Sequence, residues 1–261
     1  MSTALDEAVK RLERAAVDRV PCRPVRDIIG SDHIAAAYQV QSELIAHRVN
    51  AGAVRVGRKI GLTSPAVQQQ LGVGQPDFGV LLDDMAVLDG GTVSAGRLLQ
   101  PKVEGEVAFR LAADLDGEIS QETVRAAVAS AHAAIEIVDS RVAGWDIRIA
   151  DTVADNASSG MFVISELAVP LSEVEPVNVT MTLTVNAEPV SRGVGRACLG
   201  DPLLALEWLA RTAAEYGDPL RAGELILSGA LGPMVEVHPG DQVQVTISGL
   251  GAVGASFGTK D

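Results

Sequence analysis

The sequence predicts an α+β protein, with helices concentrated near the start of the chain and strands in most of the rest. Near the start, apolar residues such as Leu5, Ala8, Leu12 and Ala15 recur at helical spacing, whereas from about Val80 the hydrophobic period changes to two. Later helices interrupt the strands irregularly. This order favours an α+β arrangement over a doubly wound sheet, in which strands and helices alternate regularly.

The first fifty residues are expected to form two helices. The first contains the spaced apolar residues just named. The second carries Ile34, Tyr38 and Ile45 at the same spacing, and either Ser31 or Asp32 is placed to cap its free N–H groups.

The segment that follows contains the predicted boundary between two regions. Ser64 and Pro65 are placed as the N-cap and first residue of a brief helix that ends near Leu71. Residues 72–79, GVGQPDFG, hold three glycines and one proline and are expected to form a loop. The change of period near residue 75 divides the chain into residues 1–75 and residues 76–261.

Most of the second region reads as strands of an antiparallel or mixed sheet. A turn at residues 89–91, Asp-Gly-Gly, separates two short apolar runs. Apolar residues alternate with Asn and Thr over residues 177–185, so this strand has one solvated and one buried face. The same alternation over residues 243–247 and 253–257 predicts two further paired strands.

Two helices are expected among these strands. Ser120 can cap a helix that runs from about Gln121 to Ala134. Asp201 and the proline after it open a second helix, which stops at Gly217.

Composition and charge exclude several classes of protein. The 261 residues include 34 Asp and Glu against 21 Lys and Arg, a net charge of −13, and no basic run exceeds a dipeptide. Such a chain is suited neither to nucleic acid nor to an acidic membrane surface. The start of the chain lacks the apolar stretch of a signal peptide, and no run approaches the roughly 18 apolar residues of a membrane span, so we expect a soluble cytoplasmic protein. Cys22 and Cys198 are isolated and indicate neither a disulfide nor a redox pair.

The clearest candidate site is a group of three glutamates. If residues 101–111, PKVEGEVAFRL, form a strand, the apolar side chains point to one side while Lys102, Glu104 and Glu106 point to the other. Glu136 lies between two isoleucines on a second expected strand. Three carboxylates without a nearby His or Cys favour a hard divalent ion such as Mg²⁺ or Mn²⁺. The alternative is a solvated sheet face without any metal.

Further candidates are less specific. Lys59 lies in an apolar stretch upstream of Asp77 and could bind an anionic substrate or transfer a proton, or it could be a surface cation. The polar run DTVADNASSG, residues 151–160, reads either as a site loop or as an ordinary turn. The four histidines lack zinc-ligand spacing, and no nucleotide-binding fingerprint occurs in a suitable context.

Four long motifs resemble the 2-oxopent-4-enoate (2-hydroxypenta-2,4-dienoate) hydratase family of the fumarylacetoacetate hydrolase superfamily. The resemblance covers about Ala15 to Phe257, and one departure is Gly105, where the family commonly has alanine. The motifs, in chain order, are VGRKIGLTSPAVQQQLGVGQPDFGVL, LLQPKVEGEVAF, AAIEIVDSRVAGWDIRIADTVADNASSG and LSGALGPMVEV.

The resemblance implies a fold, a metal and a reaction. The fold is a mixed β-sandwich roll, with residues 1–75 as an N-terminal helical α/β cap region and residues 76–261 as the catalytic β-roll domain. The reaction is a hydro-lyase step in meta-cleavage degradation of aromatic compounds, in which water adds to 2-hydroxypenta-2,4-dienoate to give 4-hydroxy-2-oxopentanoate. A homo-oligomer is implied, and a complex with a neighbouring pathway enzyme is a further expectation.

The resemblance also assigns residues. The Mg²⁺ or Mn²⁺ ligands of the family fall on Glu104, Glu106 and Glu136. The active-site lysine matches Lys59, the aspartate of the PDFG motif matches Asp77, and the serine of the DNAS segment matches Ser158.

Three alternatives stay open. A 4-oxalocrotonate decarboxylase shares the fold, the metal and the glutamates, but the GRKIG, QPDFG and SGALGP segments side with the hydratases. A non-catalytic subunit that binds a divalent ion or an organic acid would need the glutamates but not Lys59 or Asp77. Hydrolysis of a carbon–carbon bond usually requires a His–Glu pair, and no histidine lies in such a motif here.

Overall fold

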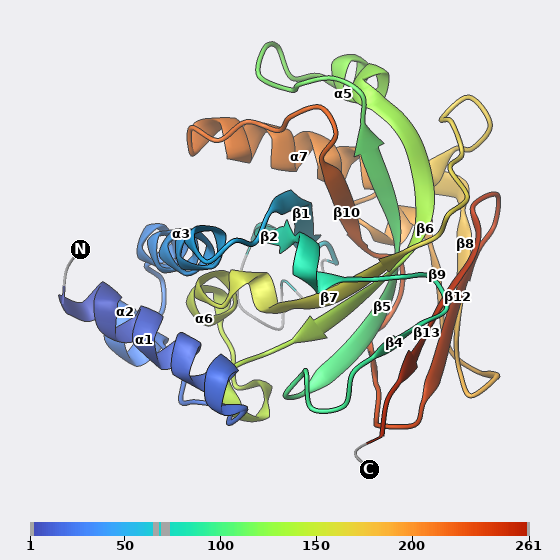
Figure 1. The fold of residues 1–261 in the computed structure, drawn as a ribbon. Coiled ribbons are helices and arrows are strands. Elements are labelled where there is room, and N and C mark those ends of the chain that lie inside the picture. Colours follow the sequence, from blue (N-terminus) through green and yellow to red (C-terminus); the bar gives the residue numbers. More distant parts are fainter. Residues whose placement is uncertain (1–2, 65–67, 69–73, 260–261) are drawn as a thin grey trace.

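Two sheets form the strand-rich part of the chain in this computed structural model, which describes residues 3–64, 68 and 74–259 (Figure 1). The larger sheet contains β1 (Arg55–Gly61), β2 (Asp77–Leu82), β3 (Ala86–Val87), β5 (Pro101–Leu111), β6 (Val128–Asp139), β7 (Ser159–Ile164), β10 (Leu225–Ala230) and β11 (Val235–Glu236). Its strand order is β2-β1-β10-β5-β6-β7-β3, and β11 pairs with β5 outside this path. β1 and β10 are parallel, whereas β5 is antiparallel to both β10 and β6.

The smaller sheet contains β4 (Gly91–Val93), β8 (Thr180–Val185), β9 (Glu188–Val194), β12 (Gln242–Ile247) and β13 (Gly251–Phe257). Its order is β4-β13-β12-β8-β9, and it lies against β5 and β6 of the larger sheet (Figure 1). The mixed sheets and helices confirm the predicted α+β class.

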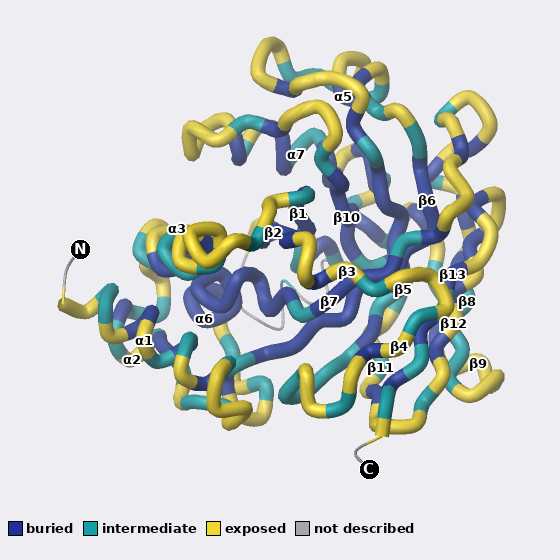
Figure 2. The backbone as a smooth tube through the Cα atoms, in the orientation of Figure 1, coloured by how far each residue is buried: buried dark blue, intermediate teal, exposed yellow. Residues whose placement is uncertain are grey.

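Apolar side chains between the two sheets form much of the buried core, which appears as the dark interior of Figure 2. Val103 and Val107 of β5 and Ile135 and Ile137 of β6 are completely inaccessible to solvent. The smaller sheet covers them with the apolar face of its alternating strands, including Met181, Leu183, Val243, Val245 and Val253. Since side chains of a strand alternate between faces, the polar residues of β5 and β6 point to the opposite side of the larger sheet.

Helices lie at the other side and along one end of the larger sheet. They are α1 (Thr3–Asp18), α2 (Arg26–Ile29), α3 (Ile34–Asn50), α5 (Gln121–Ala127), α6 (Ile149–Ala154) and α7 (Pro202–Glu215), with 3-10 turns η1 (Asp83–Met85), η2 (Ala143–Trp145), η3 (Asn156–Ser158), η4 (Pro176–Asn178) and η5 (Gly195–Ala197). α1, α2, α3 and α6 are grouped together, away from the smaller sheet (Figure 1). The buried amide of Gln41 on α3 donates to the carbonyls of Phe78 in β2 and Val153 in α6, at 3.0 and 2.8 Å. α3 therefore ties together two of the segments that reach the site described below.

Several predicted elements are confirmed. The two N-terminal helices are α1 and α3, Ser120 caps α5 by accepting from the N–H of Thr123, and Asp201 caps α7 by accepting from the N–H of Leu203. β12 and β13 pair antiparallel as expected. None of the helices in the described residues combines the length and apolar composition needed to cross a bilayer.

Other predictions were wrong. The helix expected over residues 121–134 ends at Ala127, because the alanine-rich segment after it pairs with β5 as strand β6. Neither Ser31 nor Asp32 caps α3, whose N-cap is His33 without a side-chain hydrogen bond. Within the expected loop 72–79, Asp77 to Gly79 belong to β2 and pair with β1.

Two predictions in the same part of the chain have other outcomes. The helix predicted from Ser64 to Leu71 lies largely outside the described residues. The division at residue 75 stays a prediction, and β1 from the first region lies within the larger sheet between β2 and β10.

Candidate metal centre and active site

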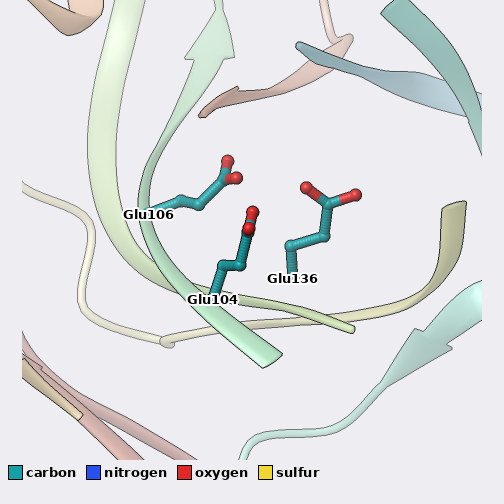
Figure 3. A group of neighbouring side chains, drawn as sticks. All are labelled: Glu104, Glu106 and Glu136. Atoms are coloured by element: carbon teal, nitrogen blue, oxygen red, sulfur yellow. The ribbon is translucent and has the colours of Figure 1, made fainter. Parts of the chain in front are cut away.

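Three carboxylates converge on the face of the larger sheet that points away from the core (Figure 3). Glu104 lies directly opposite Glu136 in the antiparallel β5–β6 pair, and Glu106 follows two residues further along β5. Each glutamate offers a carboxylate oxygen within 4.8 Å of the others. The predicted neighbours on one strand face and the predicted third glutamate on a second strand are thus brought together.

The electrostatics of this cluster call for a cation. Glu106 and Glu136 are 0% and 1% exposed. Burial and the charge of Glu136 raise the pKa of Glu104 to about 7 and hold the pKa of Glu106 well above its ordinary value. Glu106 Oε1 and Glu136 Oε2 are buried, and neither has a hydrogen-bond partner among the described residues. Buried carboxylate oxygens that repel one another and lack hydrogen-bond donors are the ligands that a hard divalent ion prefers.

The other oxygen of Glu106 is fixed by the backbone of Gly229. The Gly229 N–H donates to Glu106 Oε2 at 2.8 Å. Gly229 has a φ of +113°, and a Cβ at this position would lie 2.4 Å from the side chain of Thr63. Only glycine therefore lets β10 approach Thr63 and direct its N–H toward the carboxylate.

Lys59 projects from β1 into the same cluster. Its ammonium Nζ lies 2.9 Å from Glu136 Oε1, and both side chains are almost completely buried. Burial alone would lower the pKa of the ammonium, but the carboxylates of Glu136 and Asp77 outweigh burial and raise it. Paired with Glu136 in this way, the ammonium of Lys59 is a buried positive charge that can donate hydrogen bonds.

Asp77, at the start of β2, is 1% exposed, and no side chain or backbone group in the described part of the chain bonds to its Oδ1. The Thr152 hydroxyl donates to Asp77 Oδ2 at 3.3 Å and lies 3.2 Å from Ser158 Oγ. Because Thr152 gives its single hydrogen to Asp77, Ser158 donates to Thr152. Burial raises the pKa of Asp77, although the charge of Lys59 lowers it. The three side chains form a short chain of hydrogen bonds that starts from a carboxyl group suited to proton transfer.

The backbone that carries Ser158 has an unusual conformation. Asn156, Ala157 and Ser158 all have a positive φ, between 51 and 54°. The side chain of Asn156 holds this turn by exchanging two hydrogen bonds with the backbone of Val80, at 2.8 and 2.9 Å. The polar run over residues 151–160 is therefore the end of α6, η3 and the start of β7, rather than the loop or ordinary turn considered from the sequence. Consecutive strained residues are typical of functional sites.

A cavity of about 200 Å³ lies beside the glutamate cluster. Lys59, Asp77, Glu104 and Ser158 line it, and so does Thr152, which the sequence interpretation did not single out. Its position inside the polar run was the signal that could have identified it. The lining also includes Leu62, Lys102, Val138, Trp145, Ile147, Ala230 and Met234.

Arg58 is next to Lys59 but points to the other side of β1. It is 1% exposed and pairs with Asp218 at 3.2 Å and Glu224 at 3.7 Å. This arginine of the GRKIG motif does not line the cavity, so it supports the strand on which Lys59 lies rather than the chemistry.

Comparisons with known proteins confirm the predicted fold of the fumarylacetoacetate hydrolase type. The family described as fumarylacetoacetate (FAA) hydrolase C-terminal matches residues 53–257. A 2-keto-4-pentenoate hydratase of Paraburkholderia xenovorans (strain LB400) is 49% identical over 253 residues, which cover 97% of this chain and 94% of that protein. A 2-hydroxyhexa-2,4-dienoate hydratase of Comamonas testosteroni is 42% identical over 224 residues, or 85% of each chain. The structure of a 4-oxalocrotonate decarboxylase from Pseudomonas putida G7, complexed with magnesium and adipate, matches with a TM-score of 0.93 and 34% identity over 97% of both chains.

Proposed function

Because this chain belongs to the fumarylacetoacetate hydrolase family, and within it to the 2-keto-4-pentenoate hydratases, we propose that it is a metal-dependent hydro-lyase. It adds water to 2-hydroxypenta-2,4-dienoate, the enol form of 2-keto-4-pentenoate, and yields 4-hydroxy-2-oxopentanoate. The observation that carries this proposal is the cluster of three carboxylates with Lys59, beside a cavity that Lys59, Asp77 and Glu104 line. A chain that only bound an ion would have no use for a buried lysine and a second acidic group beside it.

A divalent ion is the cofactor that suits the site, and Glu104, Glu106 and Glu136 would hold it. Their unpartnered buried oxygens support this assignment, and Mg²⁺ or Mn²⁺ are the ions that an all-oxygen donor set prefers. When bound, such an ion supplies a Lewis acid that stabilises negative charge on an oxygen of the substrate.

Lys59 serves as a fixed positive charge in the reaction. The overall change delivers one proton to C5 and one to C3 of the dienoate and a hydroxyl group to C4. The enol hydroxyl supplies one of these protons and the added water supplies the other. Negative charge passes through the C2 oxygen during both proton transfers, and a buried ammonium close to that oxygen stabilises it.

Asp77 is the group that we assign to proton transfer. Among the described residues its Oδ1 has no hydrogen-bond partner, and burial raises the pKa of this carboxyl group, which favours a role in proton transfer. Thr152 orients this carboxyl group, and the Ser158 oxygen, which donates its hydrogen to Thr152, can accept a hydrogen bond from the attacking water. These roles, like the metal ligands, are proposals for each named residue.

The runner-up is decarboxylation of 4-oxalocrotonate, because the similarity to the decarboxylase structure covers almost the whole chain. The glutamates and the fold suit both reactions. The Asp77-Phe78 pair of the QPDFG segment sides with the hydratases, and its carboxyl group now lies in the cavity. The cytoplasmic location, the homo-oligomer and a complex with a neighbouring pathway enzyme stay predictions from the sequence.

The decisive test follows the ultraviolet absorbance of freshly generated 2-hydroxypenta-2,4-dienoate with Mg²⁺, with Mn²⁺ and with EDTA. A parallel assay measures CO₂ released from 4-oxalocrotonate. We expect metal-dependent loss of the diene, formation of 4-hydroxy-2-oxopentanoate, and loss of turnover in Asp77→Asn with Mn²⁺ affinity retained. Release of CO₂ without hydration would replace the hydratase by the decarboxylase, and full activity in Glu106→Gln would refute the metal site.

A further inference from the structure

Lys102 lies one step outward from the glutamate cluster on the same face of β5. In the β5–β6 pair, Glu106 is opposite Ala134, Glu104 is opposite Glu136, and Lys102 is opposite Val138. Successive pairs on one face are about 7 Å apart along the strands. Lys102 and Val138 both line the cavity, so this pair forms its next layer beyond the cluster.

The ammonium of Lys102 is held over an aromatic platform. Its Nζ lies 4.8 Å from the centre of the Trp145 ring, which also lines the cavity. The indole N–H of Trp145 donates to the carbonyl of Gln100 at 3.1 Å. The side chain of Gln100 in turn accepts from the N–H of Gly144 and donates to the carbonyls of Ser140 and Val142. One residue just before β5 therefore anchors the whole turn that presents the indole, and the lysine is oriented before any ligand arrives.

The charge of Lys102 is available to a ligand. Lys59 and Lys102 are the cations among the described residues of the cavity lining, and Lys59 is already paired with Glu136. The carboxylate paired with Lys102 is that of Glu236, at 3.9 Å on a side chain that is 69% exposed, so this ion pair is long and solvated. An anionic substrate that enters a cavity rich in carboxylates needs such a cation.

We propose that Lys102, oriented by Trp145, binds the carboxylate of the substrate and thereby sets the direction in which the dienoate lies. This inference rests on the proposed function, since it assumes a 2-hydroxydienoate substrate. The carboxylate end lies at the outer layer beside Lys102, and the diene points toward Asp77, to which we assign proton transfer. Lys102 is thus a substrate-binding residue in addition to the residues matched to the family motifs.

The test measures binding directly, with 2-oxopentanoate as an unreactive ligand that keeps the carboxylate and the C2 oxygen. Calorimetric titration of the Mg²⁺-loaded protein should show that Lys102→Met weakens binding about 10- to 100-fold, the effect expected from losing a charged hydrogen-bond donor. Lys102→Arg should restore most of the affinity. Lys10→Met removes the same charge from the exposed surface of α1 and should leave affinity unchanged.

Kinetics and a second ligand complete the test. Because the lost contact exists both before and during the reaction, Lys102→Met should raise KM for the dienoate and change kcat little. Unchanged affinity for 2-oxopentanoate in Lys102→Met would overturn the proposal. The second ligand is 2-oxoadipate, which has another carboxylate at its far end. If Lys102→Met weakened binding of 2-oxoadipate only, Lys102 would bind that far carboxylate, and this result would also overturn the proposal. A wild-type protein that turns over no dienoate would refute the proposed function itself, whereas turnover with equal binding in both proteins would refute the role of Lys102 alone.

Discussion

Glu136→Gln and Glu106→Gln remove the same charge from the same cluster, yet they should change the stability of the metal-free protein differently. Glu136 carries the ion pair with Lys59, at 2.9 Å. Glu106 has no ion pair among the described residues, and its Oε2 accepts from the Gly229 N–H. Glutamine at position 136 leaves a buried ammonium without its main partner, whereas glutamine at position 106 can still accept from Gly229 and relieves repulsion.

The magnitudes follow from the geometry. Two unit charges 2.9 Å apart attract by about 6 kcal/mol at an effective dielectric constant of 20. Asp77 also lies near Lys59 and replaces part of this attraction, so we expect Glu136→Gln to lower the free energy of unfolding by about 3 kcal/mol, as for other buried pairs that lose one partner. Since glutamine at position 106 can keep the hydrogen bond from the Gly229 N–H and relieves repulsion between like charges, Glu106→Gln should change stability by no more than about 1 kcal/mol.

Urea unfolding in EDTA near neutral pH measures both values, and equal m-values show that the variants unfold from comparable states. Both variants should also lose most of their Mn²⁺ affinity, which confirms that each change reaches the cluster. Equal destabilisation by the two substitutions would refute the reasoning, because it would mean that the Lys59–Glu136 pair adds nothing beyond the loss of one carboxylate.

Three further predictions concern the surroundings of the cluster. Thr152→Val removes the hydroxyl that links Asp77 to Ser158, so it should lower kcat with little change in Mn²⁺ affinity. Thr152→Ser keeps the hydroxyl and should keep the rate. A slow Thr152→Ser variant would contradict the hydrogen-bond explanation. Gly229→Ala should lower the free energy of unfolding in urea by about 2 kcal/mol or more, because Gly229 has a φ of +113° and an added Cβ would clash with Thr63. Gly223→Ala is the matched control, since Gly223 also has a positive φ but an added Cβ there would meet no described atom within 4 Å. The pKa of Glu104 is raised to about 7, so protons compete with the metal ion for this carboxylate below that pH. Mn²⁺ affinity should therefore fall as the pH drops from 8 to 6. An affinity that does not change with pH would show that Glu104 is not a ligand.

Local pattern was enough to predict which side chains share a face and where some helices begin. The period of two over residues 101–111 placed Lys102, Glu104 and Glu106 on one face, because alternation is a property of each strand by itself. Ser120 and Asp201 were recognised as caps for the same reason, since a capping side chain needs only the N–H groups two or three residues ahead. The family motifs carried the rest of the candidate site.

Tertiary structure decided what depends on partners far away in the chain. The alanine-rich segment after Ala127 has high helix propensity, but pairing with β5 along its whole length makes it strand β6. The register of that pairing sets Glu136 opposite Glu104, and a slip by one residue would turn Glu136 into the core. The link from Asp77 through Thr152 joins residues 75 positions apart, so no local spacing could reveal it. The sequence alone thus determines which residues of a strand share a face, and long-range strand pairing determines which residues of different strands come into contact.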